Sequence, residues 1–251
     1  MRSVQDWIDA YLPLITDAEA SACTDAEISA FEQKWQVVFR EDHKRFLRLF
    51  GGRTARQNMP GFLQITNSYY AVATMDGFYE DYLDFPDEVH IPSGWQMFAK
   101  HDVDCNIAVN QRTGELYTYD GDILYDFYAD SIDEFLAQQL YVYINFNAPV
   151  NKKKIIGFSG NRPPNTDEQI KAFLRQHGFA VFEKLCNVKK IAAQRGDVYF
   201  FSDFESPNFS RVLSQNFGFF AFAAPEAEAN RAEILVQALA AMLGLKRRIR
   251  T

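Results

Sequence analysis

The sequence predicts an α+β protein made of two consecutive units. Amphipathic helical segments with recognisable ends alternate with short strand-like runs separated by turn residues. A polar segment from Asn147 to Lys154, containing Pro149, separates two halves of opposite charge. We therefore expect an antiparallel sheet with flanking helices over 1–148 and a second, smaller α+β unit over 150–251.

Three helices are predicted at the N-terminus. The first covers 4–15, where apolar residues recur on one helical face. The second begins after Thr24, because Thr24 and Glu27 have the spacing of a capping box. The third covers 41–50, and the pair Gly51-Gly52 predicts a left-handed stop at its end.

Strand-like runs rich in aromatic and β-branched residues follow the glycine pair. Their ranges are 62–65, 69–73, 95–99, 107–110, 115–119 and 123–127. Turn residues separate the last four runs, which predicts an antiparallel meander. Ser131 and Glu134 then form a second capping box, which opens the helix that closes this unit.

The second half has its own pattern of helices and strands. Strands are predicted at 155–159, 180–185, 188–193, 197–202 and 217–224, and helices at 166–177 and 227–243. Gly178 is placed to end the first of these helices. The segment from Gly157 to Arg162 is predicted to be a loop, and it resembles a phosphate-binding loop only in outline, because the third glycine is missing.

The lack of recognisable targeting signals and the spacing of the cysteines predict a soluble cytoplasmic protein. The N-terminus lacks the apolar stretch of a secretory signal, and no apolar run approaches the roughly 20 residues that span a bilayer. The three cysteines, Cys23, Cys105 and Cys186, are far apart and lack metal-binding spacing. Reduced thiols are therefore expected, with no cofactor.

Charge is distributed unequally between the two halves. Residues 1–150 hold 24 Asp and Glu against 10 Lys and Arg, a net charge of −14, and residues 151–251 hold 9 against 16, a net charge of +7. The first half should therefore repel nucleic acid and attract cationic partners. A solubilising surface, or attraction between the two halves in a scaffold role, would also account for the pattern.

The densest group of possible metal ligands is His101-Asp102-Val103-Asp104-Cys105. Imidazole, carboxylate and thiolate all bind metals, so a metal-dependent hydrolase with its site here is the alternative enzymatic interpretation. However, the segment has the composition of a turn between strands, and no helical histidine pair or Cys-x-x-Cys accompanies it. We therefore expect no catalytic residues and no metal site.

One block of the sequence resembles a known family. The block runs from Glu27 through Phe39-Arg40-Glu41-Asp42-His43 to Phe50-Gly51-Gly52, and Ser131-Ile132-Asp133-Glu134-Phe135-Leu136 matches the closing helix. It resembles the SUKH superfamily over roughly residues 24–145. The resemblance implies an α+β fold of about six strands and no general catalytic residues.

Many bacterial SUKH members resemble immunity proteins, which bind and neutralise a toxin. The resemblance thus implies a non-enzymatic binder of a cognate protein toxin, with nucleases as one candidate class, and the acidic first half fits a basic toxin. The predicted partner-binding residues are Tyr79, Glu80, Asp81, Tyr82, Asp84, Asp87, Glu88, Asp120, Asp122 and Asp126. Packing in the core is the alternative role for Tyr79 and Tyr82.

Overall fold

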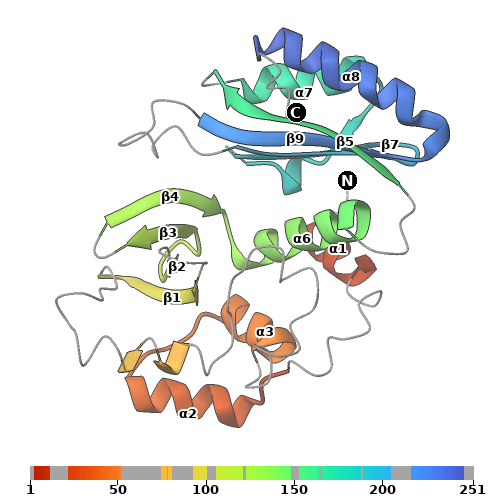
Figure 1. Ribbon diagram of the computed structural model, residues 1–251. Helices are drawn as coiled ribbons and strands as arrows, with labels where there is room; N and C mark the ends of the chain where they lie inside the picture. Colours follow the sequence, from red (N-terminus) through yellow and green to blue (C-terminus); the bar gives the residue numbers. More distant parts are fainter. Residues whose placement is uncertain are drawn as a thin grey trace. The chain divides into compact units, whose positions relative to one another are not determined.

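Figure 1 shows the computed structural model of the chain. The structure describes residues 3–11, 22–51, 75–77, 79–80, 93–100, 106–120, 123–147, 153–163, 166–187, 189–204 and 216–245. The chain divides into two compact units, one of Gln5–Leu140 and one of Tyr141–Thr251 together with Met1–Val4. This division lies ahead of the predicted limit at 148 and falls within the helix α6 (Ile132–Val142).

Three helices open the N-terminal unit, close to the predicted positions. They are α1 (Val4–Tyr11), α2 (Asp25–Trp35) and α3 (Glu41–Phe50). The capping box before α2 is confirmed: the Glu27 amide donates to the Thr24 hydroxyl at 3.2 Å, and the Thr24 amide donates to the Glu27 carboxylate at 2.9 Å. These two bonds satisfy amides that lack partners inside the helix.

The end of α3 is at the predicted residue, but Gly51 is not a left-handed residue, so the left-handed stop predicted from the glycine pair stays a prediction for Gly52. Gly51 has a φ of −89°, which any residue can adopt, and Gly52 lies outside the described residues. Lack of space for a side chain accounts for the glycine at position 51. A Cβ at Gly51 would lie 2.8 Å from the Cα of Leu47, closer than packed atoms approach.

The four described strands of the N-terminal unit form the predicted antiparallel meander. They are β1 (Trp95–Lys100), β2 (Asn106–Asn110), β3 (Leu116–Asp120) and β4 (Ile123–Ala129), in the order β1-β2-β3-β4. The runs predicted at 62–65 and 69–73 lie outside the described residues. Gly114 has a φ of +87° in the turn between β2 and β3. The Arg40 guanidinium donates a hydrogen bond to the Gln111 carbonyl of that turn at 3.0 Å.

The helix α6 closes this unit, and its start uses a modified capping box. The Glu134 amide donates to the Ser131 hydroxyl at 3.1 Å, as the spacing predicts. The Glu134 carboxylate, however, accepts from the amide of Asp130 at 2.6 Å, one residue before the cap. A π-helical segment, Tyr143–Asn147, follows α6.

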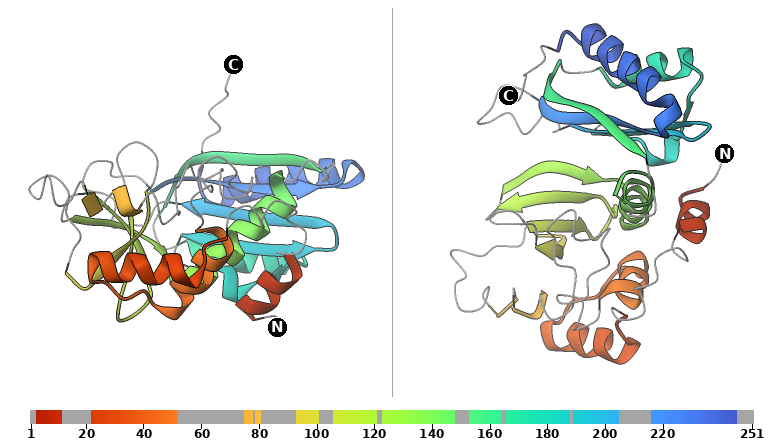
Figure 2. Two further views of the ribbon diagram at one scale, coloured as in Figure 1. Left: turned by 90° about the horizontal axis from the view of Figure 1, so that it is seen from below. Right: turned by 45° about the vertical axis from the view of Figure 1, so that its right-hand side comes forward.

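The C-terminal unit is an antiparallel five-stranded sheet in the order β5-β9-β8-β7-β6. Its strands are β5 (Lys154–Arg162), β6 (Ala180–Val181), β7 (Lys190–Arg195), β8 (Val198–Phe204) and β9 (Asn216–Ala224). Its helices are α7 (Asp167–Gln176) and α8 (Ala229–Met242), with 3-10 turns at Glu183–Leu185 and Glu226–Glu228. Figure 2 shows both sheets with their helices from two further directions.

Two predictions for the C-terminal unit are wrong. The segment from Gly157 to Arg162 is not a loop: it continues β5, and every residue in it pairs with β9. The strand expected at 180–185 ends after Val181, and a 3-10 turn replaces its second half. The left-handed end of α7 at Gly178, with a φ of +80°, is confirmed.

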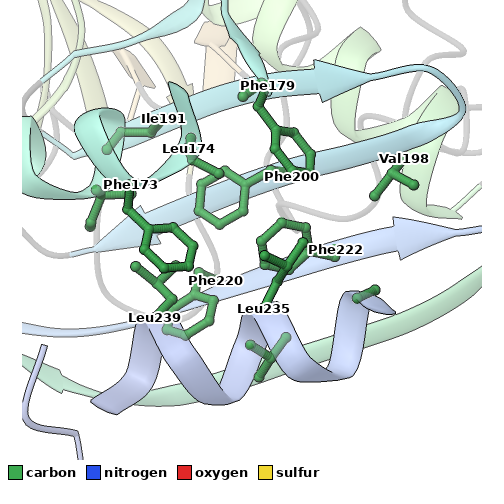
Figure 3. Close-up of a cluster of buried hydrophobic side chains, with 14 of the residues drawn as sticks. Phe173, Leu174, Phe179, Ile191, Val198, Phe200, Phe220, Phe222, Leu235 and Leu239 are labelled. Carbon is green, nitrogen blue, oxygen red and sulfur yellow. The ribbon is translucent and has the colours of Figure 1, made fainter. Parts of the chain in front are cut away.

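Both helices of the C-terminal unit cover one face of its sheet. Phe173 and Leu174 from α7 and Leu235 and Leu239 from α8 point toward the phenylalanines of β8 and β9 (Figure 3). Phe200, for example, is fully buried. Burial of this aromatic layer removes a large apolar area from water and is the main stabilising contribution in this unit.

The other face of the same sheet is covered by the segment that starts the unit. The rings of Tyr141 and Phe146 both pack against the ring of Phe201, each with 6.3 Å between ring centroids. The Tyr141 hydroxyl donates to the Ala193 carbonyl at 2.8 Å and also lies 3.0 Å from the Phe200 carbonyl. The segment that follows Leu140 is therefore part of the C-terminal core.

Candidate surface for binding a partner

Glu80, one of the predicted partner-binding residues, belongs to an ion-pair cluster on the surface of the N-terminal unit. The Lys34 ammonium lies 2.9 Å from a carboxylate oxygen of Asp76 and 2.9 Å from one of Glu80. The Trp35 indole nitrogen donates to the same Asp76 oxygen at 2.7 Å. We call Lys34, Trp35, Asp76 and Glu80 the Lys34 cluster.

The Lys34 cluster is exposed, and its charges are partly balanced. The Glu80 side chain is 60% exposed and that of Lys34 is 46% exposed. The hydrogen bonds that the Lys34 ammonium donates to Asp76 and to Glu80 raise the pKa of Lys34 above its ordinary value. One ammonium against two carboxylates leaves the cluster with a net negative charge at neutral pH.

Tyr79, another predicted partner-binding residue, lies in the core beneath this cluster. It is 7% exposed, and its ring meets Phe31 edge-on at 5.6 Å and Trp35 at 5.2 Å. Burial raises the pKa of Tyr79 to about 12. Its side chain thus anchors the helical residues that present Asp76 and Glu80.

A row of three aromatic rings crosses the four-stranded sheet. The rings of Trp95 and Tyr117 meet edge-on at 5.3 Å, and those of Tyr117 and Phe127 meet edge-on at 5.5 Å. All three side chains are half-buried. Residues 95, 117 and 127 belong to β1, β3 and β4, and we call them the aromatic ladder.

Strand register explains how the aromatic ladder forms. Ala108 of β2 lies between Met97 of β1 and Tyr117 of β3, and Tyr117 faces Phe127 of β4. The small Ala108 side chain lets the rings from β1 and β3 meet across the intervening strand. Residues that oppose each other on paired strands lie on the same face of the sheet. The ladder therefore lies on the same face as Met97 and Ala108, which belong to the buried hydrophobic cluster that also contains Tyr79.

Most described cations of the N-terminal unit are paired with carboxylates of the same unit. Besides Lys34, the pairs are Arg40–Asp42, Lys44–Glu32, Arg45–Asp133 and Arg48–Asp25, all at 3.1 Å or less. Such surface pairs contribute roughly 0–1 kcal/mol each to stability. Each pair cancels one charge of either sign, so the net negative charge of residues 1–150 resides on the other carboxylates.

Comparison with known protein families identifies the family to which the N-terminal unit is similar. Residues 22–138 match the SMI1 / KNR4 family (SUKH-1). The N-terminal half is a SUKH domain. The match spans α2, α3, the four-stranded sheet and most of α6, and it confirms the resemblance found in the sequence. Comparison with curated proteins gives no match.

The other predicted partner-binding residues of the SUKH domain fall into two groups. Asp81, Tyr82, Asp84, Asp87, Glu88 and Asp122 lie outside the described residues. Asp120 and Asp126 lie in β3 and β4, where their backbones pair with Ile123 and Thr118. Their assignment to a partner surface stays a prediction.

Sequence reasoning did not select the aromatic ladder of the SUKH domain. Each of its residues was assigned to a strand, but a strand assignment does not say which residues of separate strands meet. In β3, Leu116 and Tyr119 are buried and Tyr117 lies between them, so burial does not follow the two-residue period by which a strand is recognised in a sequence. Only the register of the paired strands brings the three rings together.

The described residues contain no group of three or more His, Cys, Asp and Glu that could hold a metal ion. The predicted alternative site at His101–Cys105 lies outside the described residues. His43 is fully buried between the rings of Phe39 and Phe98, at 4.5 and 5.3 Å. Within the part of the chain that the structure describes, neither of its ring nitrogens has a hydrogen-bond partner, and burial lowers its pKa to about 3.

No helix among the described residues is both long enough and apolar enough to cross a membrane.

Proposed function

We propose that this protein is an immunity-type binder whose SUKH domain neutralises a basic bacterial toxin without making or breaking covalent bonds. The match of residues 22–138 to the SUKH family carries this proposal, because membership is consistent with an immunity-type protein. The net charge of −14 in residues 1–150 supports a cationic partner, since complementary potentials steer association.

A toxin that cleaves nucleic acid is the partner class that this charge favours. The active site of a nuclease must attract phosphates and is therefore basic. A strongly acidic protein surface competes for that site by the same electrostatic attraction. The proposed function thus needs no catalytic residue in this chain.

The Lys34 cluster and the aromatic ladder would have different roles in binding. Exposed carboxylates, with Glu80 as the described example, would accelerate encounter with the toxin. The aromatic ladder would supply the anchors that slow dissociation, because large, half-buried rings lose little conformational freedom on binding. A stable complex would bury about 800 Å² on each partner.

Co-expression tests the function directly. The toxin would be the product of a neighbouring gene that encodes a small C-terminal effector domain, and it would be expressed with and without this chain. We expect cells to grow only when the chain is present. Killing at full potency in its presence would refute the proposal.

Substitution of the ladder tests which surface binds. Tyr117→Ala and Phe127→Ala should each weaken toxin binding by about tenfold or more, mainly through faster dissociation, because each removes an anchor ring worth more than about 1 kcal/mol. Phe219→Ala is the matched control, since Phe219 is 44% exposed in the C-terminal unit. Equal affinities for all three variants, measured by surface plasmon resonance, would remove the ladder from the interface.

Charge reversal tests the steering role. Replacement of Asp81, Asp84 and Asp87 by lysine should slow association and flatten its dependence on salt, with little change in dissociation. The same triple change at Glu168, Glu183 and Glu233, which lie in the C-terminal unit, matches the change in net charge. If both variants associate at the same rate, Asp81, Asp84 and Asp87 do not steer the association.

A further inference from the structure

β5 forms one edge of the five-stranded sheet, and β6 forms the other. β6 has only two residues, whereas β5 has nine, and all nine pair with β9 without a bulge. Between Lys154 and Arg162 this strand contains no charged residue and no proline. Proteins usually protect a long edge strand with charges, prolines or bulges, because its free amides and carbonyls can pair with another strand.

The surroundings of Gly157 show which backbone groups of β5 point outward. A Cβ at Gly157 would lie 2.8 Å from the carbonyl oxygen of Phe220, so this oxygen points toward β5. Hydrogen-bonded and non-hydrogen-bonded residue pairs alternate along an antiparallel ladder. Phe220 pairs with Phe158, so Phe158 is the hydrogen-bonded residue, and the amide and carbonyl of Gly157 point away from β9.

The same alternation applies along the whole strand. Ile155, Ser159 and Asn161 share the orientation of Gly157, so their amides and carbonyls also point away from β9. No described residue is hydrogen-bonded to the outward amides and carbonyls of Ile155, Gly157 and Ser159. Only an extended chain offers donors and acceptors at this spacing, so the kind of ligand that fits the edge is a strand.

One face of the sheet beside this edge carries exposed apolar side chains. Ile155 is 47% exposed and Phe219 is 44% exposed. Ser159 pairs with Phe219, and Ile155 pairs with Ala223, so the two exposed side chains share one face. Because Gly157 and Ser159 are small, side chains of an added strand can reach Phe219 across β5.

Cations flank the uncharged part of β5. The sequence from 152 to 162 contains Lys152, Lys153, Lys154 and Arg162 and no acidic residue. The Lys154 side chain is 55% exposed, and its ammonium lies 3.8 Å from a carboxylate oxygen of Glu226, which is 83% exposed. So open a pair contributes little to stability, and a carboxylate of a partner can take the place of Glu226.

We propose that the edge of β5 binds an extended acidic segment of a partner protein as a sixth strand of this sheet. Its backbone would bond to the outward groups of β5, and its apolar side chains would pack on Ile155 and Phe219. Acidic residues near its end would pair with Lys154.

Charge selects such a partner over a second copy of the chain. Two antiparallel β5 strands centred on Phe158 would place Lys154 of one copy opposite Arg162 of the other, and like charges that face each other destabilise a strand pair. The same cations repel a basic toxin. The inference is therefore independent of the function proposed for the SUKH domain.

Amide hydrogen exchange of the full-length chain, followed by NMR, tests whether the edge is open. The amides of Ile156 and Phe158 bond to β9 and should exchange slowly, whereas those of Ile155, Gly157 and Ser159 should exchange rapidly. A bound strand should slow the second set. Slow exchange of both sets in the free chain would show that the edge is already covered and would overturn the proposal.

Two synthetic peptides test the chemistry of the partner. Each has nine residues, the length of β5, with alternating valine and threonine in the middle. One has two aspartates at each end, and the other has two lysines there. We expect the aspartate peptide to bind with a Kd of about 100 µM or less and the lysine peptide at least about tenfold more weakly. Fluorescence anisotropy at about 150 mM salt measures both, because charges more than about 8 Å away are then screened.

Substitution of Ser159 tests whether the edge is the binding site. Ser159→Pro removes an outward amide and no bond to β9, so it should weaken binding of the aspartate peptide by about fivefold or more. Ser159→Ala is the matched control, since it keeps the amide, and it should bind like the natural chain. Thermal unfolding shows whether the proline variant is folded, and the comparison of the two peptides needs no variant.

Four results would overturn the proposal. The aspartate peptide does not bind, the two peptides bind equally well, or the Ser159→Pro and Ser159→Ala variants have equal affinity. The fourth result is dimerisation of the natural chain in sedimentation velocity that Ser159→Pro abolishes, which would assign the edge to a second copy.

Discussion

At the scale of single residues, the SUKH domain buries a histidine, His43, in its core. It occupies a fully buried position among aromatic rings, where a neutral imidazole is tolerated and an imidazolium is not. Its pKa is about 3 in the folded protein against 6.5 ordinarily. In the unfolded chain the ring is exposed to water and takes up a proton near the ordinary pKa.

This difference makes stability depend on pH. Between pH 6.5 and 3 the unfolded state binds a proton that the folded state does not, so the free energy of unfolding falls as pH is lowered through this window. Between pH 7 and pH 5 this residue should cost the protein about 2 kcal/mol. His43→Leu should remove that loss, as measured by urea unfolding at the two pH values.

His177→Gln is the control for this prediction. The Nδ1 atom of His177 lies 2.8 Å from the Phe173 carbonyl at the end of α7, in the other unit. The control should keep the pH dependence of the natural chain. An equal loss of stability in the His43→Leu variant and the natural chain would show that another group causes the acid sensitivity.

At the scale of the element, helix starts are encoded locally. The capping box at Thr24 and Glu27 needs only residues three apart, and both of its hydrogen bonds are present. The end of α3 illustrates the opposite case. Its position was evident from the glycine pair, but the reason for Gly51 is the nearby Leu47 backbone, which a rule based on left-handed φ does not consider.

The cap of α2 permits a quantitative prediction. Thr24→Ala should lower the free energy of unfolding by about 1 kcal/mol, because one amide of the first turn loses its acceptor. Ser29→Ala, at an exposed position inside the same helix, should change it by less than about 0.5 kcal/mol. Chemical denaturation of both variants gives the comparison, and equal effects would show that the cap does not stabilise the domain.

At the scale of the whole molecule, the division between the units falls before Tyr141. The boundary expected at 148–150 followed composition, since proline and polar residues mark linkers. The buried ring of Tyr141 and the ring of Phe146 belong to the core of the C-terminal unit, although they precede that linker in the chain. Composition does not indicate which core a residue joins.

Fragments test this division. A fragment of residues 141–251 should unfold cooperatively, whereas a fragment of 149–251 should be less stable by about 3 kcal/mol or more, because it lacks a fully buried aromatic side chain. Tyr141→Phe in the longer fragment should cost only about 1–2 kcal/mol, the loss of one buried hydrogen bond. Fragments of equal stability would place the boundary at the linker instead.

The sequence by itself determined the α+β class, the capped helices, the order of the four-stranded meander, the family of the N-terminal half and its negative charge. These features depend on residues that are close in the chain or on composition. Only the tertiary structure decided which distant side chains meet. The pairing of Lys34 with Asp76 and Glu80, the burial of Tyr79 and the aromatic ladder depend on strand register and helix packing, which bring together residues that the chain separates.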